Sequence, residues 1–168
     1  VHGADGFGNT NPPKPEGKVI DQSACDFIIE QVNAHPGEIT IVALAPLTNL
    51  ALAIQKDPSI ASKVKEVVVM GGVVRRSGNI TPVSEANIYG DPHAADAVMI
   101  AGWPLTMVSL DITMQVIMTD DYVERLKQGN PKLGGFIYDV SRFYKQYYAK
   151  QFGFNGFAFC LLYTSDAA

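Results

Sequence analysis

The sequence predicts an α/β protein with a doubly wound, mainly parallel sheet. Residues 39–44, 64–70 and 105–110 are short apolar runs, and the first two are rich in β-branched residues, as strands buried in a parallel sheet are. Stretches with helical periodicity separate these runs, and alternating strands and helices form right-handed βαβ units. In open sheets of this kind ligands bind beyond the carboxyl ends of the strands, so the loops after the three runs are candidate sites.

The first third of the chain begins with a loop and a helix. Residues 1–18 are rich in Gly, Pro and Asn and are typical of a surface loop. An apolar i, i+3, i+4 pattern predicts a helix over 20–34, with Asp21 or Ser23 as its N-cap. Pro36-Gly37 ends this helix, and the strand 39–44 that follows is expected to be covered on both faces.

The middle of the chain contains the other two predicted strands. Residues 45–55 pass from a strand end into a helix, and Asp57-Pro58 starts another short helix. The strand 64–70 is followed by Gly71-Gly72. Residues 73–90 are polar and show no strong period, which predicts a long loop.

Three further helices are predicted toward the end of the chain. Asp91 is expected to cap a helix over 91–102, with Pro92 at its first position. Residues 119–128 and 132–151 also look helical. The last carries a Phe/Tyr-rich stripe at helical spacing, which is most simply explained by packing.

Composition limits the possible functions. The chain has 168 residues, of which 47% are hydrophobic and 18% charged, enough for one domain with a substantial core. The net charge of −4 argues against nucleic acid or an anionic membrane surface as a partner. No apolar run is long enough to span a bilayer. Cys25 and Cys160 show neither metal spacing nor a disulfide framework, so we expect a reduced, cytoplasmic setting.

Polar residues gather at two of the predicted strand ends. In APLTN (45–49), Thr48 and Asn49 could present a carbonyl or hydroxyl to a ligand, or could simply cap a helix. In GNITPVSEAN (78–87), Glu85 and Asn87 lie two apart, which would place both side chains on one side of an extended segment. With Asn79 they suit a neutral polyol, because a carboxylate accepts from hydroxyls while amides donate and accept. A solvated loop with Asx turns is the alternative.

The remaining candidates are weaker. Asp111 follows the third strand and could support a metal or ligand, although a helix N-cap is the more common role. Arg75-Arg76 could meet a phosphate or could simply be solvated. The three histidines are scattered, and only His2 lies in a glycine-rich loop. No P-loop, dinucleotide fingerprint, serine nucleophile elbow or CxxC motif occurs in the sequence.

Several stretches taken together resemble one enzyme family. VHGADGFGN, ALAPLTNLALAI, VVVMGG and GNITPVSEANIYGDPHAAD are similar, in order and spacing, to the middle of the inosine/uridine-preferring nucleoside hydrolases. The later LDITMQ and GGFIYDVSRFYKQYY resemble the uridine-nucleosidase-like branch. The resemblance covers about residues 1–159.

The resemblance implies calcium-dependent hydrolysis of the N-glycosidic bond of ribonucleosides on a doubly wound α/β fold. Carried over by position, the backbone carbonyl of Thr48 would bind Ca²⁺, and Met70 would line the pocket beneath the sugar. Asn79, Glu85 and Asn87 would bind the ribose hydroxyls, and His2 would lie near the base. A homo-oligomer, either a dimer or a tetramer, is also implied for the whole protein.

The sequence departs from the family pattern in three places. The aspartate cluster DxDxxxDD, which supplies the general base and most calcium ligands, is absent, and Ala86 stands where the family has an aromatic residue. The family continues after GFNGFAF into a His-Asp-Pro motif, whereas this chain reads CLLYTSDAA.

These departures lead to an interpretation of the chain as a fragment. We interpret residues 1–159 as the central part of one nucleoside hydrolase-like domain and 160–168 as a foreign read-through tail. Such a chain is expected to bind no calcium and to be inactive alone. A non-catalytic nucleoside- or sugar-binding module is the alternative.

Overall fold

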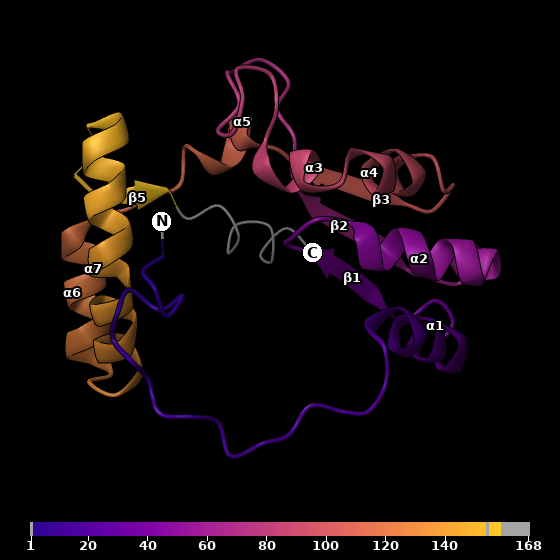
Figure 1. Cartoon of the computed structure of the whole chain (residues 1–168), viewed down its shortest axis with the longest axis horizontal. Coiled ribbons are helices and arrows are strands. Elements are labelled where there is room, and N and C mark those ends of the chain that lie inside the picture. The colour runs from indigo at the N-terminus through magenta and orange to yellow at the C-terminus, as the bar shows by residue number, and fades with distance from the viewer. Residues whose placement is uncertain (1, 154, 159–168) are drawn as a thin grey trace. The chain divides into compact units, whose positions relative to one another are not determined.

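The computed structural model describes residues 2–153 and 155–158, except for the side chains of residues 151 and 152. The predicted foreign tail, 160–168, lies outside the described residues. The chain divides into two compact units (Figure 1). Of the described residues, 20–114 form the sheet unit, and 2–19, 115–153 and 155–158 form the two-helix unit.

A parallel sheet forms the centre of the sheet unit. Strands β1 (Thr40–Ala43), β2 (Glu66–Met70) and β3 (Leu105–Val108) pair in the order β1-β2-β3, with all neighbours parallel. The predicted strands and the parallel α/β fold class are therefore confirmed. Because both crossovers step in the same direction and crossovers are right-handed, their helices are expected on one face of the sheet.

Helices of the sheet unit begin where local caps place them. Helix α1 (Ala24–Ala34) starts after Ser23, whose hydroxyl accepts from the Asp26 N–H at 3.2 Å, and thus later than the predicted residue 20. Helix α4 (Pro92–Met99) starts after Asp91, which accepts from the Ala94 N–H at 3.0 Å, as predicted. Helix α2 (Thr48–Lys56) and the 3₁₀ helix η1 (Pro58–Ser62) connect β1 to β2.

The three strands differ in burial. Central β2 is buried from Val67 to Met70, as its apolar run predicts. Strand β1 is only half-buried along its whole length, because it lies at the edge of the sheet and pairs with β2 alone in the part of the chain described. The prediction that β1 is covered on both faces was therefore wrong for this chain.

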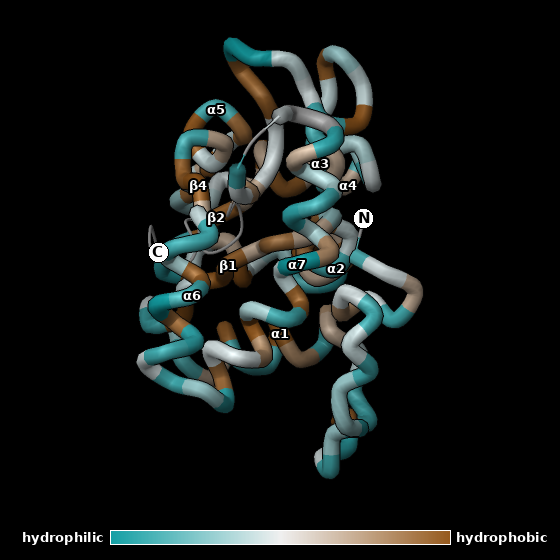
Figure 2. Tube along the Cα trace, turned by 90° about the vertical axis from the view of Figure 1, so that its left-hand side faces the viewer, coloured by the Kyte–Doolittle hydropathy of each residue, from teal (hydrophilic) through white to brown (hydrophobic). Residues whose placement is uncertain are grey.

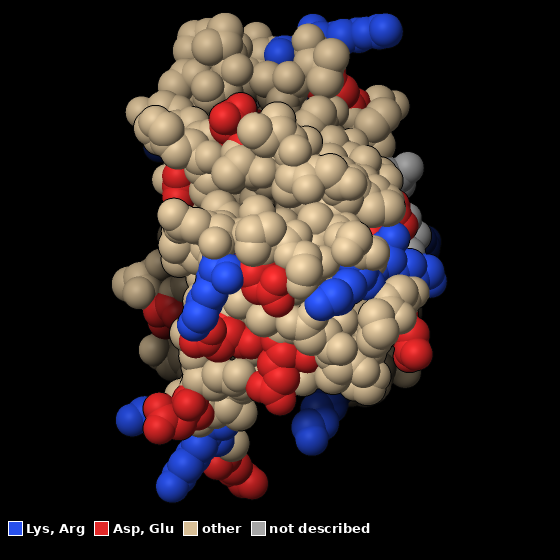
Figure 3. Space-filling model, turned by 90° about the vertical axis from the view of Figure 1, so that its right-hand side faces the viewer, with Lys and Arg blue, Asp and Glu red and all other residues tan. Residues whose placement is uncertain are grey.

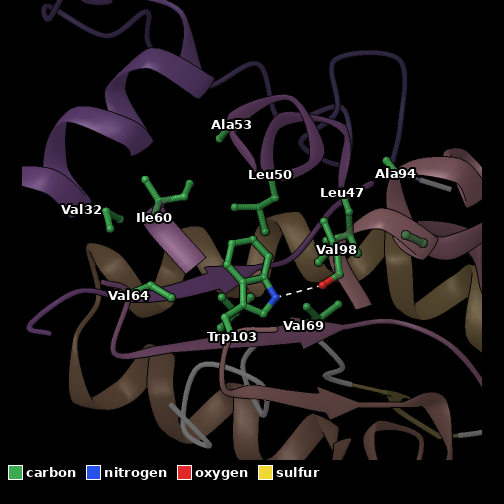
Figure 4. Packing of buried hydrophobic residues seen from close by; sticks show 12 residues of the cluster. Val32, Leu47, Leu50, Ala53, Ile60, Val64, Val69, Ala94, Val98 and Trp103 are labelled. Atoms are coloured by element: carbon green, nitrogen blue, oxygen red, sulfur yellow. Dashed lines mark hydrogen bonds between the residues drawn. The ribbon is translucent and has the colours of Figure 1, made fainter. Parts of the chain in front are cut away.

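The core lies between the helices and one face of the sheet (Figure 4). It contains residues from α1, α2, η1, β2 and α4, among them Val32, Leu50, Ile60, Val69 and Val98. The Trp103 indole also lies in this cluster, where its Nε1–H donates to the Val98 carbonyl at 2.9 Å. The bond satisfies the polar atom of a side chain that is otherwise buried in apolar surroundings.

Two short helices occur near the carboxyl ends of the strands. Helix α3 (Ala86–Gly90) lies inside the segment 73–90 that was predicted as a loop, so that prediction was wrong at its end. Helix α5 (Leu110–Thr113) follows β3 directly, and Ser109, not Asp111, is its N-cap residue. The N-cap role expected for Asp111 was therefore also wrong.

The two-helix unit is built on an antiparallel helix pair. Helices α6 (Asp120–Gly129) and α7 (Leu133–Phe152) agree with the predicted ranges within a few residues. Helix α6 is mostly polar, with apolar residues recurring three apart (Figure 2), as expected for a helix with one face packed on a neighbour. Short strands β4 (Ile117–Met118) and β5 (Phe157–Ala158) pair antiparallel.

The surface carries charges of both signs. On the face shown in Figure 3, acidic and basic side chains lie side by side over its lower part. Among the described residues, no helix combines the length and the apolar character needed to cross a membrane.

The α6–α7 packing generates a prediction with a matched control. A Cβ at Gly134 would lie 2.0 Å from the Leu126 carbonyl oxygen, whereas a Cβ at Gly135 would meet nothing within 4 Å. We expect Gly134→Ala to lower the free energy of unfolding by about 1–3 kcal/mol, because the helices must separate. Gly135→Ala should raise it by up to about 1 kcal/mol through helix propensity. Urea unfolding followed by circular dichroism measures the free energy of unfolding of both variants. Equal changes in the two variants would contradict the close packing of Gly134 against α6.

Candidate functional site

Glu85 is a buried acidic residue of the predicted site, and it is only 2% exposed. Its Oε2 accepts from the N–H groups of Gly72 and Ile88, both at 3.1 Å, and its Oε1 accepts from the Asn87 N–H at 2.9 Å. Glu85 is thus the N-cap of α3 and also binds the loop that follows β2. These backbone donors replace the water that a buried carboxylate loses.

The Gly71-Gly72 pair after β2 allows this close approach. Gly72 has a φ of 76°, in the left-handed region that favours glycine. A Cβ at Gly71 would lie 3.1 Å from Ile88 Cδ1 and 3.4 Å from Glu85 Oε2. A side chain at residue 71 would therefore crowd the helix and carboxylate against which the strand end packs.

Two asparagines complete the arrangement around α3. The Asn87 amide Nδ2 donates to the Met70 carbonyl at 3.1 Å and approaches the Leu44 carbonyl at 3.5 Å, so it contacts the ends of both β1 and β2. Asn79 Oδ1 accepts from the Ala86 N–H at 2.9 Å. The structure therefore brings four sequence-predicted residues together: Met70, Asn79, Glu85 and Asn87.

The way in which Glu85 and Asn87 come together differs from the prediction. They were expected on one side of an extended segment, but only Glu85 is extended, with φ −87° and ψ 148°, and Asn87 lies in the first turn of α3. Glu85 instead folds back over the helix N-terminus, while the Asn87 side chain contacts the strand ends. The alternation argument was thus wrong, and capping accounts for the arrangement.

Thr48 lies at the first position of α2, near the end of β1. Its hydroxyl donates to Asp91 Oδ2 at 2.6 Å, which links the start of α2 to the start of α4. This hydrogen bond, together with that from the Ala94 N–H, lowers the pKa of the Asp91 carboxyl. The Thr48 carbonyl belongs to the first helical turn, where one lone pair serves the helix and the second is left for another donor or a cation.

Asp111 binds the start of the loop that carries Asn79. Its Oδ2 and Oδ1 accept from the N–H groups of Val74 and Arg75, each at 2.8 Å, and the Ser109 hydroxyl donates to Oδ2 at 3.0 Å. The Arg75 and Val74 N–H groups lower the pKa of Asp111 to about 2. Sequence reasoning missed this role, because nothing local connects residues 36 or 37 positions apart.

His2 belongs to the two-helix unit, whereas the other predicted site residues belong to the sheet unit. Its ring stacks on Tyr144 of α7, with ring centroids 4.9 Å apart and an interplanar angle of 24°. Tyr144 also lies edge-on to Tyr148 at 4.9 Å, and the two hydroxyls are 3.3 Å apart. Tyr144 was assigned only to packing at the sequence level, and its helical spacing gave no sign of a histidine partner.

The side chains around α3 retain hydrogen-bonding capacity. A carboxylate has about four acceptor positions, and Glu85 uses three for the backbone, which leaves one on Oε1. Within the described residues, Asn87 Oδ1 accepts no hydrogen bond and Asn79 Nδ2 donates none. These two acceptors and one amide donor near the same helix terminus are groups of the kind that hydrogen-bond to hydroxyls.

The same residues do not make a metal site by themselves. Within residues 2–153 and 155–158, no three His, Cys, Asp or Glu side chains lie close enough together to hold a metal ion. Ca²⁺ takes six to eight oxygen ligands, and the Thr48 carbonyl would supply one. The predicted calcium ion therefore does not fit the residues of this chain alone.

Comparison with known proteins identifies the family. The inosine-uridine preferring nucleoside hydrolase family matches residues 1–166. The chain belongs to this family. Its curated relatives include "Probable uridine nucleosidase 1" from Oryza sativa subsp. japonica, 47% identical over 156 residues, or 93% of this chain and 48% of the relative. "Uridine nucleosidase 1" from Arabidopsis thaliana is 46% identical over 156 residues, or 93% of this chain and 46% of the relative.

Solved structures of nucleoside hydrolases share the fold. A plant nucleoside hydrolase superposes with a TM-score of 0.96 at 44% identity, over 99% of this chain and 52% of that one. A purine-preferring ribonucleoside hydrolase from Gardnerella vaginalis superposes with a TM-score of 0.94 at 34% identity. The match covers 99% of this chain and 54% of that one. The resemblance to the family, and to its uridine-nucleosidase-like branch, is confirmed. The chain spans about half the length of the curated relatives it matches.

The Asp111 contacts predict how the stability of the folded protein depends on pH. Because the folded state lowers the Asp111 pKa from 3.8 to about 2, the ionised carboxylate stabilises the fold above the unfolded value. In the full-length protein, wild type should therefore be more stable than Asp111→Asn at pH 6. This margin should shrink as the pH falls from about 5 toward about 2.

Unfolding free energies from urea titrations across this pH range test the Asp111 contacts. Asp96→Asn, on the exposed side of α4, is the control and should show no comparable change. A wild-type margin over Asp111→Asn that stays constant down to pH 2 would contradict the role of the ionised carboxylate.

Proposed function

We propose that the whole protein of which this sequence forms part hydrolyses the N-glycosidic bond of ribonucleosides, yielding ribose and free base. The observation that carries the proposal is the buried Glu85 carboxylate, which keeps an acceptor position beside Asn87 in a member of the nucleoside hydrolase family. The uridine nucleosidase relatives make uridine the first substrate to test.

Ribose binding is the role proposed for the polar residues around α3. Glu85 Oε1 and Asn87 Oδ1 would accept from neighbouring ribose hydroxyls, and Asn79 Nδ2 would donate to a hydroxyl oxygen. These groups are already fixed by bonds to the backbone of β2 and α3. A site that needs little reordering loses less side-chain entropy when substrate binds.

Electrostatics would then favour bond cleavage. As the bond between ribose and base breaks, the sugar gains positive charge and resembles an oxocarbenium ion. The Glu85 carboxylate, fixed by three N–H donors, would stabilise this charge without reorganisation. Met70 would line the pocket beneath the sugar, and His2 would lie near the base.

Calcium dependence is part of the proposal for the whole protein. The Thr48 carbonyl would be one ligand, and the others would come from parts of the whole protein that this chain does not span. If calcium is bound there in the whole protein, it would supply Lewis acidity for a bound water molecule and would help to orient the sugar hydroxyls. The proposed setting is nucleoside catabolism, and the cytoplasmic location and homo-oligomeric state stay predictions from the sequence.

Substitution of Glu85 tests the proposed site directly. In the full-length protein, Glu85→Gln should lower kcat/KM for uridine by about 10²–10³, because the charge that stabilises the transition state is lost. Glu38→Gln, at an exposed position in the sheet unit, is the matched control and should keep wild-type activity. Release of uracil, followed by absorbance, gives the rate.

The outcomes separate the proposal from its alternative. If Glu85→Gln retains wild-type kcat/KM, Glu85 does not act in the reaction. If the wild-type protein binds ribose or uridine but never releases base, it is a non-catalytic nucleoside-binding module.

The isolated 168-residue chain should behave differently from the whole protein. We expect no heat of calcium binding in calorimetry and no release of base from uridine, since the chain offers too few oxygen ligands. We also expect concentration-dependent aggregation through the edge of β1, which among the described residues pairs with β2 alone. Calcium-dependent release of uracil by this chain alone would contradict its proposed inactivity.

A further inference from the structure

One acidic residue outside the ribose-binding group organises the loop that carries His2. Asp5 Oδ1 accepts from the N–H groups of Phe7 and Asn9, both at 2.8 Å, and Asp5 Oδ2 accepts from the Asn11 N–H at 2.8 Å. Residues 2–11, called here the His2 loop, thus wrap around a single carboxylate. Both Asp5 oxygens accept from the loop backbone, so this one side chain connects residues 5, 7, 9 and 11 of the loop.

The loop adopts a backbone that needs such support. Asn9 and Asn11 have φ values of 62° and 48°, in the left-handed region that residues other than glycine rarely adopt. Their N–H groups are two of those that donate to Asp5. The Asn9 side chain in turn accepts from the Ala4 N–H at 2.7 Å. Backbone in sparsely populated regions persists only where surrounding contacts fix it, and it clusters at functional sites.

The loop also packs closely against α7 within the same unit. A Cβ at Gly8 would lie 2.7 Å from the Val140 carbonyl oxygen and 3.3 Å from Phe143 Cβ. The Gly8 N–H donates to the His2 carbonyl at 2.8 Å, so Gly8, which packs against α7, is also hydrogen-bonded to His2. Phe7 and Phe136 add a ring contact at 6.4 Å between centroids.

His2 lies at the end of this chain of contacts. Its side chain is exposed, yet its ring stacks on Tyr144 rather than extending freely into solvent. Tyr144 is itself held by rings on two elements, Tyr148 of α7 and Phe157 of β5. The His2 ring therefore has a fixed platform beneath it, and its backbone position depends on the loop.

We propose that Asp5 is a positioning residue for nucleoside hydrolysis, which fixes the His2 loop so that the His2 ring stays stacked on Tyr144. The proposal rests on the proposed function, in which His2 lies near the base. Asp5 acts through His2 and touches neither substrate nor reacting atoms.

The protonation state of Asp5 agrees with this role. The Asn11 N–H, together with those of Phe7 and Asn9, lowers the pKa of the Asp5 carboxyl. At neutral pH the side chain is therefore ionised, and ionised carboxylates make the stronger bonds to N–H donors.

The first arm of the test observes the stack without relying on catalysis. In the full-length protein, the NMR signals of the His2 ring are assigned as those that disappear in His2→Asn. Tyr144→Leu, which removes the stacked ring, then gives the chemical shifts of the His2 ring without the Tyr144 ring current. Asp5→Ala should move the His2 signals toward the Tyr144→Leu positions. Asp5→Asn, which keeps one acceptor oxygen, should move them part of the way. Asp21→Ala, an exposed aspartate outside the loop, should leave them unchanged.

The second arm measures uridine hydrolysis as a double-mutant cycle. If the loop is correctly placed only about a tenth of the time in Asp5→Ala, KM rises about tenfold while kcat stays within about twofold. In a His2→Asn background, Asp5→Ala should then have no further effect on KM, because Asp5 acts through His2. If Asp5 contributed only to stability, Asp5→Ala would leave the His2 ring signals unchanged, and its effect on KM would not depend on His2.

The outcomes of the two arms are distinguishable. Asp5→Ala with unchanged His2 ring signals overturns the proposal, as does an equal KM effect with and without His2. If the wild-type protein hydrolyses no nucleoside, the proposed function fails, and the role of Asp5 in hydrolysis fails with it. The ring signals then still show whether Asp5 fixes the stack.

Discussion

The arrangement of the sheet unit depends most on the three backbone N–H groups that bind the Glu85 carboxylate. One donor comes from Gly72 at the end of β2 and two come from the first turn of α3. A single buried charge thus determines both where the helix begins and how the strand end approaches it. Leaving such a carboxylate unpaired would cost several kcal/mol, so these bonds and the glycine pair that permits them depend on one another.

Much of the fold could be predicted from the sequence because its determinants are local. The β-branched run before Met70 predicted a buried strand, and Asp91-Pro92 correctly predicted the N-cap and the first residue of α4. The start of α1 was predicted four residues early, because periodicity extends past the Ser23 cap. The sequence did not predict that β1 is an edge strand of the described sheet, since burial of a strand depends on neighbours that its own residues do not specify.

The candidate site was predictable in its residues but not in its geometry. Helix α3 has only five residues and no apolar period, so nothing in its own sequence distinguishes it from a loop. It forms because Asn79 and Glu85 bind its first N–H groups, and the Asn79 contact spans seven residues. The Thr48–Asp91 bond joins residues 43 positions apart and is equally invisible to local patterns. Family resemblance identified the residues, and tertiary contacts determine how each is held.

The central claim is that Glu85 and Asn87 together bind one ribose. The most direct test is a crystal structure of the full-length protein with a ribose-containing inhibitor whose glycosidic bond cannot be cleaved. Our account predicts sugar hydroxyls within about 3.2 Å of both Glu85 Oε1 and Asn87 Oδ1, with the backbone bonds of Glu85 intact. A sugar bound elsewhere, or hydroxyls that contact neither side chain, would contradict it.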